Sequence, residues 1–369
     1  MSSSTGEFGA VHRGLTAFTP RACQGVLVRL SKVKWVAVGL TVAILGVELA
    51  LGGSSLIQAL GTLRTPRWGW LVLALLAEAA SMAMYARMQR RLLRAAGTAV
   101  PLSQAVGLAY AAHSLSVTLP GGPAFSTAFN FQQMRRFGAT SAVASWATAM
   151  SGVLSMASLA AVGALAAALA ARADGPAAVV STVLPALAIG LVAQVLARRP
   201  QWLLRPAVFA LGLVNRLLRR PPERGRDAVQ RFLDQLATVR VRPADRLAAS
   251  GFALANWAFD GLGFALACVA AGLHGNGITP DHLVVAYAAG MAASTISVIP
   301  GGLGVVDGAL VLGLVAGGVH ARRAIGAVVL YRLVSLGVIG AIGWLFWLTL
   351  RIRHREQRGE AKERSRAGG

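Results

Sequence analysis

The feature that most constrains this chain is a series of eight long apolar blocks. They cover residues 35–51, 68–86, 102–119, 141–171, 177–197, 247–273, 282–299 and 324–350. Each approaches or exceeds the roughly 18–20 apolar residues that cross a hydrocarbon core about 30 Å thick. A soluble protein of 369 residues cannot bury so many such helices. The sequence therefore predicts an all-α polytopic membrane helix bundle with about eight long transmembrane helices.

The charged residues support this class and exclude others. Lys and Arg number 36 against 14 Asp and Glu, a formal net charge of +22, yet the cations lie just outside the apolar blocks. Anionic lipid headgroups hold arginines in such places, so we predict membrane lipids as partners and no nucleic acid. Of the two cysteines, Cys23 lies on a terminal segment and Cys268 inside an apolar block, so they indicate neither a disulfide nor a metal site.

The basic loops predict a topology. Residues 1–34 carry five Lys and Arg, residues 52–67 carry two, and residues 198–246 carry twelve arginines. The positive-inside rule then places both termini in the cytoplasm of a multi-pass protein. Arginine- and alanine-rich usage favours a bacterium, hence its inner membrane. With this parity, two short stretches, 124–136 and 303–318, must also cross.

The domain organisation follows from the same pattern. We expect an N-terminal cytoplasmic segment at 1–34, a transmembrane domain at 35–350 and a charged tail at 351–369. Within the domain, residues 198–246 have the spacing of amphipathic helices that lie on the inner leaflet. Association into homo-oligomers is left open by the sequence.

Two short motifs indicate an internal repeat. Leu119-Pro120-Gly121-Gly122 (LPGG) matches residues 299–302 (IPGG), and the same offset, without a gap, pairs Gly138 with Gly318. The predicted topology puts Pro120 at the outer end of its helix and Pro300 at the inner end of its own. We therefore expect an inverted repeat, as in many alternating-access transporters.

The Pro-Gly-Gly motifs predict breaks in two helices. Proline cannot continue the helical hydrogen-bond ladder, and glycine permits the left-handed backbone that a sharp break requires. The short segment after each break is too short to span, so a broken or re-entrant helix fits best. The exposed amides at a half-helix start favour anions. Candidate substrate-binding residues are thus Pro120, Gly121 and Gly122, with Pro300, Gly301 and Gly302; the alternative is a pair of structural kinks.

Arg332 lies deep in the last apolar block. An unpaired arginine at mid-helix costs roughly 2.5–3.5 kcal/mol by insertion scales, so it should face the interior and have a partner. Asp307 is the first candidate, with Glu78 and Asp260 as alternatives. A structural salt bridge and a phosphate ligand are both consistent with this residue, and they do not exclude each other.

Other polar residues lie within the apolar blocks. Glu78 and Asp260 are candidates for ion or proton coupling, while His113 is better explained as an interior histidine than as a ligand. Asn256 shares a helix face with Asp260. The first short helix is unusually polar, which suits either a wet cavity or an interfacial helix; its polar residues are Ser126, Thr127, Asn130, Gln132 and Gln133.

The sequence contains none of the common catalytic motifs. The chain has no phosphate-binding loop, no zinc-protease motif and no nucleophile elbow, so we predict no enzyme activity and no cofactor. Gly304 and Gly308 form a GxxxG pair that favours close helix packing.

Residues 300–308 (PGGLGVVDG) and 331–335 (YRLVS) resemble the lysylphosphatidylglycerol synthase transmembrane-region family, a flippase-like group. The resemblance covers roughly residues 35–350, with a looser first-half match at 119–122 and 135–138. It implies functional weight for Asp307, Tyr331 and Arg332. Many members carry a Glu-Arg pair where this chain has Met150, Ser151 and Gly152, so the resemblance does not imply a second, symmetric arginine. We expect no aminoacyltransferase domain like that of the synthases, and therefore no synthesis of the lipid.

These observations lead to a functional hypothesis. We expect a membrane protein that moves an anionic phospholipid or a lipid-linked precursor between leaflets. An accessory subunit or enzyme of polyprenyl-phosphate and glycolipid metabolism is one alternative. A secondary transporter for a small anion is another.

Overall fold

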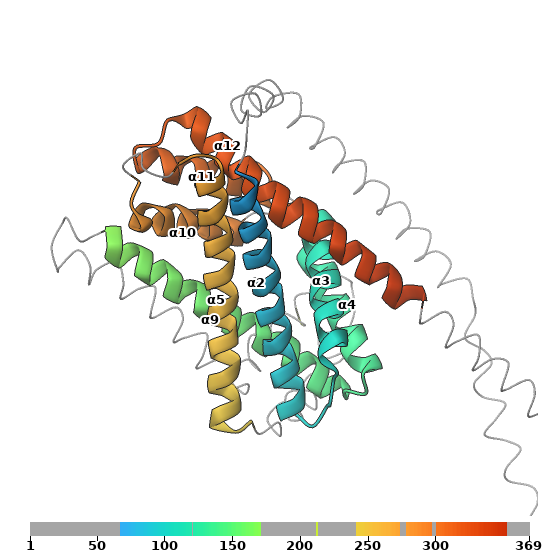
Figure 1. The fold of residues 1–369 in the computed structure, drawn as a ribbon. Coiled ribbons are helices and arrows are strands. Elements are labelled where there is room, and N and C mark those ends of the chain that lie inside the picture. Colours follow the sequence, from blue (N-terminus) through green and yellow to red (C-terminus); the bar gives the residue numbers. More distant parts are fainter. Residues whose placement is uncertain are drawn as a thin grey trace, which may run out of the picture. The chain divides into compact units, whose positions relative to one another are not determined.

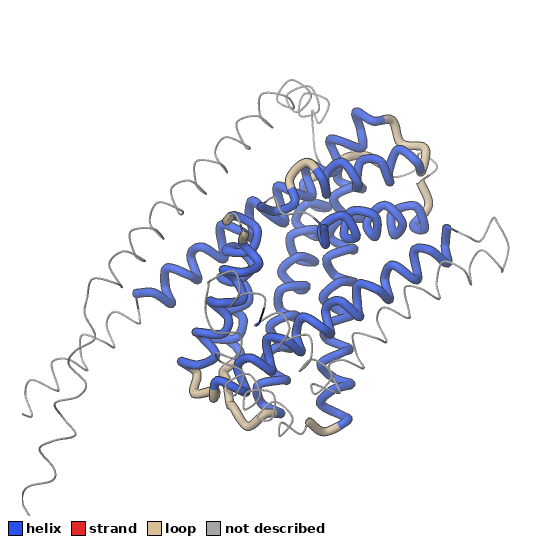
Figure 2. Tube along the Cα trace, turned by 180° about the vertical axis from the view of Figure 1, so that it is seen from behind, coloured by secondary structure: helices blue, strands red, loops and turns tan. Residues whose placement is uncertain are grey.

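The computed structural model describes residues 67–119, 121–170, 212, 241–273, 278–296 and 300–352. Every secondary-structure element in these ranges is helical (Figure 2). The predicted blocks at 35–51 and 177–197, both terminal segments and most of the amphipathic segment at 198–246 lie outside the described residues.

The described helices form two series of four (Figure 1). The first series comprises α2 (Trp68–Ala95), α3 (Leu102–Thr118), α4 (Gly122–Arg136) and α5 (Ser141–Ala170). The second comprises α9 (Pro243–Ala270), α10 (Pro280–Ile296), the 3-10 turn η4 (Pro300–Gly302), α11 (Val305–Ala316) and α12 (Ala321–Arg332). The last helix continues through the π-helical turn η5 (Leu333–Val338) to Ile352.

Four of the described helices are long and apolar enough to cross a membrane: α2, α5, α9 and the helix Ala321–Ile352. Large apolar side chains on them face outward, as Trp68 (71% exposed) and Leu247 (76% exposed) do. In water such surfaces would be unstable, whereas lipid tails cover them. Helix α9 begins at Pro243, inside the segment predicted to end at residue 246.

The two series repeat each other closely. Helices α2 and α9 both have 28 residues, and α3 and α10 both have 17. Helices α5 and α12 start at Ser141 and Ala321, which are separated by the same offset as the two Pro-Gly-Gly motifs. The predicted repeat is therefore present in the backbone itself.

The helix ends show the same repeat. Gly138 and Gly318 follow α4 and α11 with φ values of 91° and 89°. In each case the glycine N–H donates to the carbonyl three residues back, and the next N–H donates to the carbonyl five residues back. The same pair of bonds closes α2 at Gly97 and α9 at Gly272. This is a Schellman cap, which requires a left-handed residue and so favours glycine.

The two series run in opposite directions. The Arg67 N–H at the start of α2 donates to the Ala270 carbonyl at the end of α9, at 3.3 Å. At the other ends of these helices, Arg91 Nε lies 2.7 Å from Asp245 Oδ1. Helices α2 and α9 are therefore antiparallel neighbours (Figure 1). Because they are equivalent helices of the two series, the repeat is inverted, as predicted.

The short helices return alongside the helices that precede them. A Cβ on Gly290 of α10 would meet Leu310 of α11, and one on Gly313 would meet Ala286, so the two helices are antiparallel. Helix α4 packs on α3 in the same way after its glycine turn. Each pair is a re-entrant hairpin that brings the chain back to its starting side. Helices α4 and α11 have only 15 and 12 residues, which is short for a crossing, so the predicted broken or re-entrant form fits both better than a free-standing span.

Small residues let the helices approach closely. The core contains many alanines, and a Cβ on Gly343 would lie 1.9 Å from Ser114 Oγ. The predicted GxxxG contact is absent from the described structure, because a Cβ on Gly308 would meet nothing within 4 Å and Gly304 lies in the turn before α11. The close contacts are made by other glycines, which sequence spacing alone did not identify.

Candidate functional site

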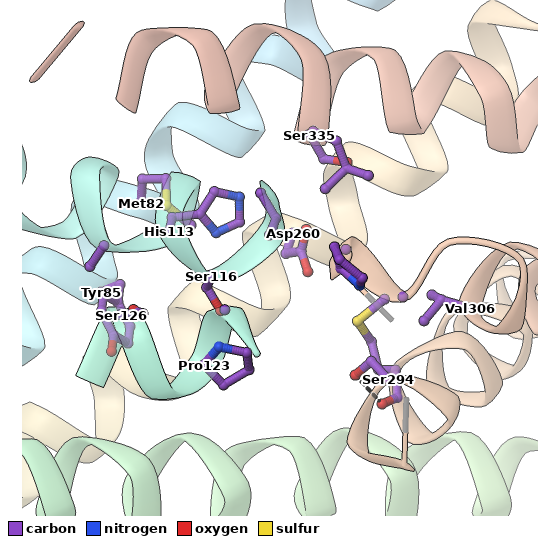
Figure 3. Close-up of a pocket in the computed structure, with 18 of the residues that line it drawn as sticks. Met82, Tyr85, His113, Ser116, Pro123, Ser126, Asp260, Ser294, Val306 and Ser335 are labelled. Atoms are coloured by element: carbon purple, nitrogen blue, oxygen red, sulfur yellow. Dashed lines mark hydrogen bonds between the residues drawn. The ribbon is translucent and has the colours of Figure 1, made fainter. Parts of the chain in front are cut away.

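The tips of the two hairpins meet at one cavity of about 690 Å³. Gly121 and Gly122 line it from the first hairpin, and residues 300–302 line it from the second. Figure 3 shows His113, Ser116 and Pro123 on one side, Ser294 and Val306 on the other, and Asp260 between them. Both predicted breaks thus contribute to the same site, although they lie in opposite halves of the sequence.

The two tips have matching backbones. Gly121 has a φ of 67° and Gly301 a φ of 64°, both in the left-handed region that disfavours side chains. A Cβ on Gly122 would lie 1.9 Å from the Ser116 carbonyl oxygen, so no larger residue fits there. A Cβ on Gly301 would lie 3.1 Å from the Val117 carbonyl oxygen, which places the second tip against α3 of the first hairpin. Pro120 lies outside the described residues.

The amides at the start of α4 are partly satisfied within the tip. The N–H groups of Ala124 and Phe125 donate to the Gly121 carbonyl, at 2.9 and 3.4 Å. At the start of α11, the Gly304 N–H donates to Asp307 Oδ2 at 3.0 Å. The second half-helix therefore begins against a carboxylate of the chain itself.

Arg332 connects α12 to the second tip. Its Nε donates to Asp307 Oδ1, and its Nη1 donates to the Gly301 carbonyl at 3.2 Å. Of the three candidate partners, Asp307 is the one that forms this ion pair. The remaining terminal nitrogen, Nη2, is buried without a hydrogen-bond partner among the described residues. The guanidinium is thus fixed on one edge while one donor group stays unused.

A π-helical turn follows Arg332 directly. It covers Leu333–Val338, and both Arg332 and Ser335 line the cavity. Ser335 is buried, and its Oγ has no hydrogen-bond partner among the described residues. Single π turns inside α-helices are rare and occur frequently at functional sites. Sequence analysis did not predict this turn.

Two tyrosines hold the carboxylate of Asp260. Tyr287 Oη donates to Oδ2 at 2.6 Å, and Tyr331 Oη donates to Oδ1 at 2.9 Å. The two rings pack on Phe264, which is fully buried. The structure therefore places Tyr331, a predicted binding residue, in the cavity wall with its hydroxyl already bonded to Asp260.

Glu78 is the second carboxyl group at the cavity. Its side chain is 3% exposed, and Oε1 has no hydrogen-bond partner among the described residues. Glu78 and Asp260 both line the cavity, and Gly263, one helical turn after Asp260, lies against the Glu78 carboxyl group. Helix α9 can approach because position 263 is glycine; a Cβ there would lie 2.8 Å from Glu78 Oε1. The two residues predicted for coupling thus lie together.

Other predicted polar residues have different roles. Asn256 Nδ2 donates to Ser81 Oγ at 2.6 Å and so joins α9 to α2. His113 lines the cavity, and its Nε2 is buried without a hydrogen-bond partner among the described residues. Of the five polar residues of α4, only Ser126 lines this cavity, while Asn130 and Gln133 are buried elsewhere.

Sequence reasoning missed the tyrosines around the carboxylates. Tyr287 bonds Asp260, and Tyr85 lines the cavity. One signal was present: the chain has only four tyrosines, and all of them lie in apolar blocks. A hydroxyl inside such a block needs a partner, so each tyrosine marks a polar contact within the bundle.

Comparison with known proteins identifies the family of the chain. A family model described as the lysylphosphatidylglycerol synthase TM region matches residues 36–343. The match spans most of the chain, including both hairpins and the cavity, and the chain therefore belongs to that family. No curated protein matches the chain.

Proposed function

We propose that this member of the lysylphosphatidylglycerol synthase TM region family moves an anionic lipid between the two leaflets of a bacterial inner membrane. The family makes it a membrane protein connected with lipids. The observation that carries the proposal is the cavity between two re-entrant tips of an inverted repeat, with Arg332 and other polar residues in its wall. In many secondary transporters the substrate site lies at such a repeat interface, near the middle of the membrane.

Arg332 supplies the charge for this proposal. The Asp307 and Gly301 contacts fix the guanidinium, and Nη2 remains as a donor for a phosphate oxygen. Arginine suits phosphate because its planar group presents several donors at once. The start of α4 adds partial positive charge at Gly121 and Gly122, which line the same cavity. In this proposal Asp307 orients Arg332, and the cavity carries out no bond-making step.

A flipping assay tests the proposal. The purified protein is placed in vesicles that contain fluorescent phosphatidylglycerol, and the label in the outer leaflet is reduced chemically. Wild type should expose nearly all of the label, while Arg332→Ala should leave the inner-leaflet fraction protected. Arg323→Ala is the matched control, since Arg323 is exposed on the same helix. Equal flipping by wild type and a folded Arg332→Ala variant would exclude this role of Arg332.

The result also addresses the alternatives. If wild type flips no lipid but takes up a small anion such as inorganic phosphate, the small-anion transporter is favoured. Loss of a glycolipid in cells that lack the protein, without flipping in vesicles, would favour a role in polyprenyl-phosphate metabolism.

The proposal includes a topology with both termini in the cytoplasm. Each hairpin returns to its starting side and so adds no net crossing. The four described spanning helices and the two predicted blocks at 35–51 and 177–197 then make six crossings. Six crossings place all strongly basic segments inside. Cysteines at Arg94 and Thr140 should then react from the cytoplasmic side, and cysteines at Thr279 and Arg322 from the opposite side. The labelling uses a background in which Cys23 and Cys268 are serine. Labelling of all four positions from one side would contradict the topology.

A further inference from the structure

We infer that Glu78 and Asp260 form a proton-binding pair, through which the proposed lipid movement is coupled to protons. The inference deepens the proposed function and rests on it for the coupling, but not for the proton site. It begins from the charges at the cavity, where Glu78, Asp260 and Arg332 line the wall and Arg332 is paired with Asp307.

Asp307 is the carboxyl group that forms the ion pair with Arg332. Asp307 takes Nε, so Glu78 and Asp260 are left with each other and with neutral donors. The groups that face them from the packed helices are Tyr110 and His113 of α3, Tyr287 of α10, and Tyr331 and Arg332 of α12. Two adjacent carboxylates in a low-dielectric interior repel strongly, and sharing one proton removes that repulsion.

The hydrogen bonds decide where the proton resides. Asp260 accepts from two tyrosine hydroxyls, an arrangement that suits a carboxylate. Glu78 has no such donors, and its Oε1 is buried without a partner among the described residues. Glu78 is therefore the member that carries the proton as an un-ionised acid. When the pair loses its proton, the proton leaves through the cavity, which both side chains line.

The position of the pair provides the coupling. An anion at Arg332 adds negative charge close to Glu78, so the proton and the anion favour each other's binding. Binding free energies are reciprocal between two such sites. The pair would then take up one proton with each anionic headgroup and release it with that headgroup.

Infrared spectroscopy of the full-length protein in detergent tests the proton site without a lipid substrate. Wild type at neutral pH should show the carbonyl stretch of a protonated carboxyl group, and this band should disappear at high pH. Glu78→Gln should lack the band. Asp260→Asn should lose the band at a lower pH than wild type, because removal of the like charge makes ionisation of the buried Glu78 easier. Asp281→Asn, in the first turn of α10 and outside the cavity, is the control that should keep it.

Three results would overturn the inference: no such band in wild type, a band that persists in Glu78→Gln, or a band that disappears at the same pH in Asp260→Asn as in wild type. Loss of the wild-type band on adding Na⁺ at constant pH would replace the proton site with a cation site. Thermal unfolding of each variant checks that it is folded.

A second measurement tests the coupling. In vesicles of phosphatidylglycerol and phosphatidylethanolamine, the wild-type flipping rate should respond to an imposed pH gradient, and the Glu78→Gln rate should not. The same response in both proteins would overturn the coupling. Absence of flipping by wild type would refute the proposed function, while the infrared result would still decide whether the pair binds a proton.

Discussion

The two hairpin tips have the same backbone and different chemistry. Gly121 and Gly301 adopt nearly the same left-handed conformation, and the helices that follow end at equivalent glycines. The Asp307–Arg332 ion pair, however, belongs to the second half alone: at the repeat offset, the corresponding positions are Thr127 and Gly152. The comparison teaches that the repeat builds a symmetric frame, whereas the candidate binding site within it is one-sided.

The largest expected effect is a loss of stability from substitution of a glycine at the tip of the first hairpin. Gly122→Ala places a Cβ 1.9 Å from a backbone oxygen that cannot yield, so we expect a loss of about 3 kcal/mol of stability or more. Gly121→Ala meets no neighbouring atom and costs only the left-handed strain, about 1–2 kcal/mol. Thermal unfolding in detergent measures both. Equal unfolding temperatures for the two variants would show that the tip is not packed as described.

The next effect tests the asymmetry of charge. Asp307→Ala removes the partner of Arg332 and should cost roughly 2 kcal/mol, less than for a fully buried pair because Asp307 is 27% exposed. Thr127→Ala, at the equivalent position in the first half, should change stability by less than about 0.5 kcal/mol. Denaturation of the two variants side by side gives the comparison. A larger loss for Thr127→Ala would reverse the assignment of the site to the second half.

A smaller effect concerns the tyrosines that hold Asp260. Tyr331→Phe and Tyr287→Phe each remove one hydrogen bond to a carboxylate, at about 1.5 kcal/mol each. The stability loss of the double variant should differ from the sum of the two single losses, because both hydroxyls donate to the same carboxylate. Strict additivity in thermal unfolding would indicate that the two hydroxyls do not share Asp260.

The smallest effect is a gain. Gly308→Ala and Gly152→Ala place a methyl group in open space inside a helix, so each should raise stability by up to about 1 kcal/mol through helix propensity. Gly313→Ala is the contrasting variant on α11, since its Cβ would lie 2.6 Å from Ala286 Cα. Stabilisation of Gly313→Ala as well would contradict the close contact of α10 and α11.

The sequence predicted the frame better than the site. Apolar length, the paired Pro-Gly-Gly motifs and the constant offset between the halves were enough for a helical membrane bundle with an inverted repeat. Charge parity alone left the form of the short helices open, because a re-entrant hairpin and a double crossing both return the chain to the side from which it started. The lengths of α4 and α11, 15 and 12 residues, favour the re-entrant form. The contacts of Gly290 and Gly313, which depend on tertiary packing, show how the second hairpin folds.

The site was predictable in its Pro-Gly-Gly tips and its charged residues, but not in the contacts between them. Arg332 and Asp307 stand out because charges inside apolar blocks are costly. The pairing of Glu78 with Asp260 was not predictable, since it arises where α2 and α9 cross with Gly263 between them. Likewise, the π turn after Arg332 has no local sequence signal. The tyrosine hydroxyls could not be assigned a role from the sequence, because their partner is a carboxylate on another helix.

The most direct test of the central claim, a one-sided anion site at Arg332, is native mass spectrometry of the detergent-purified protein. Wild type, Arg332→Ala and the control Arg323→Ala are compared for retained lipid. The account predicts that wild type and the control retain an anionic phospholipid and that Arg332→Ala loses it. Equal retention by all three proteins, or no selective retention by wild type, would contradict the account.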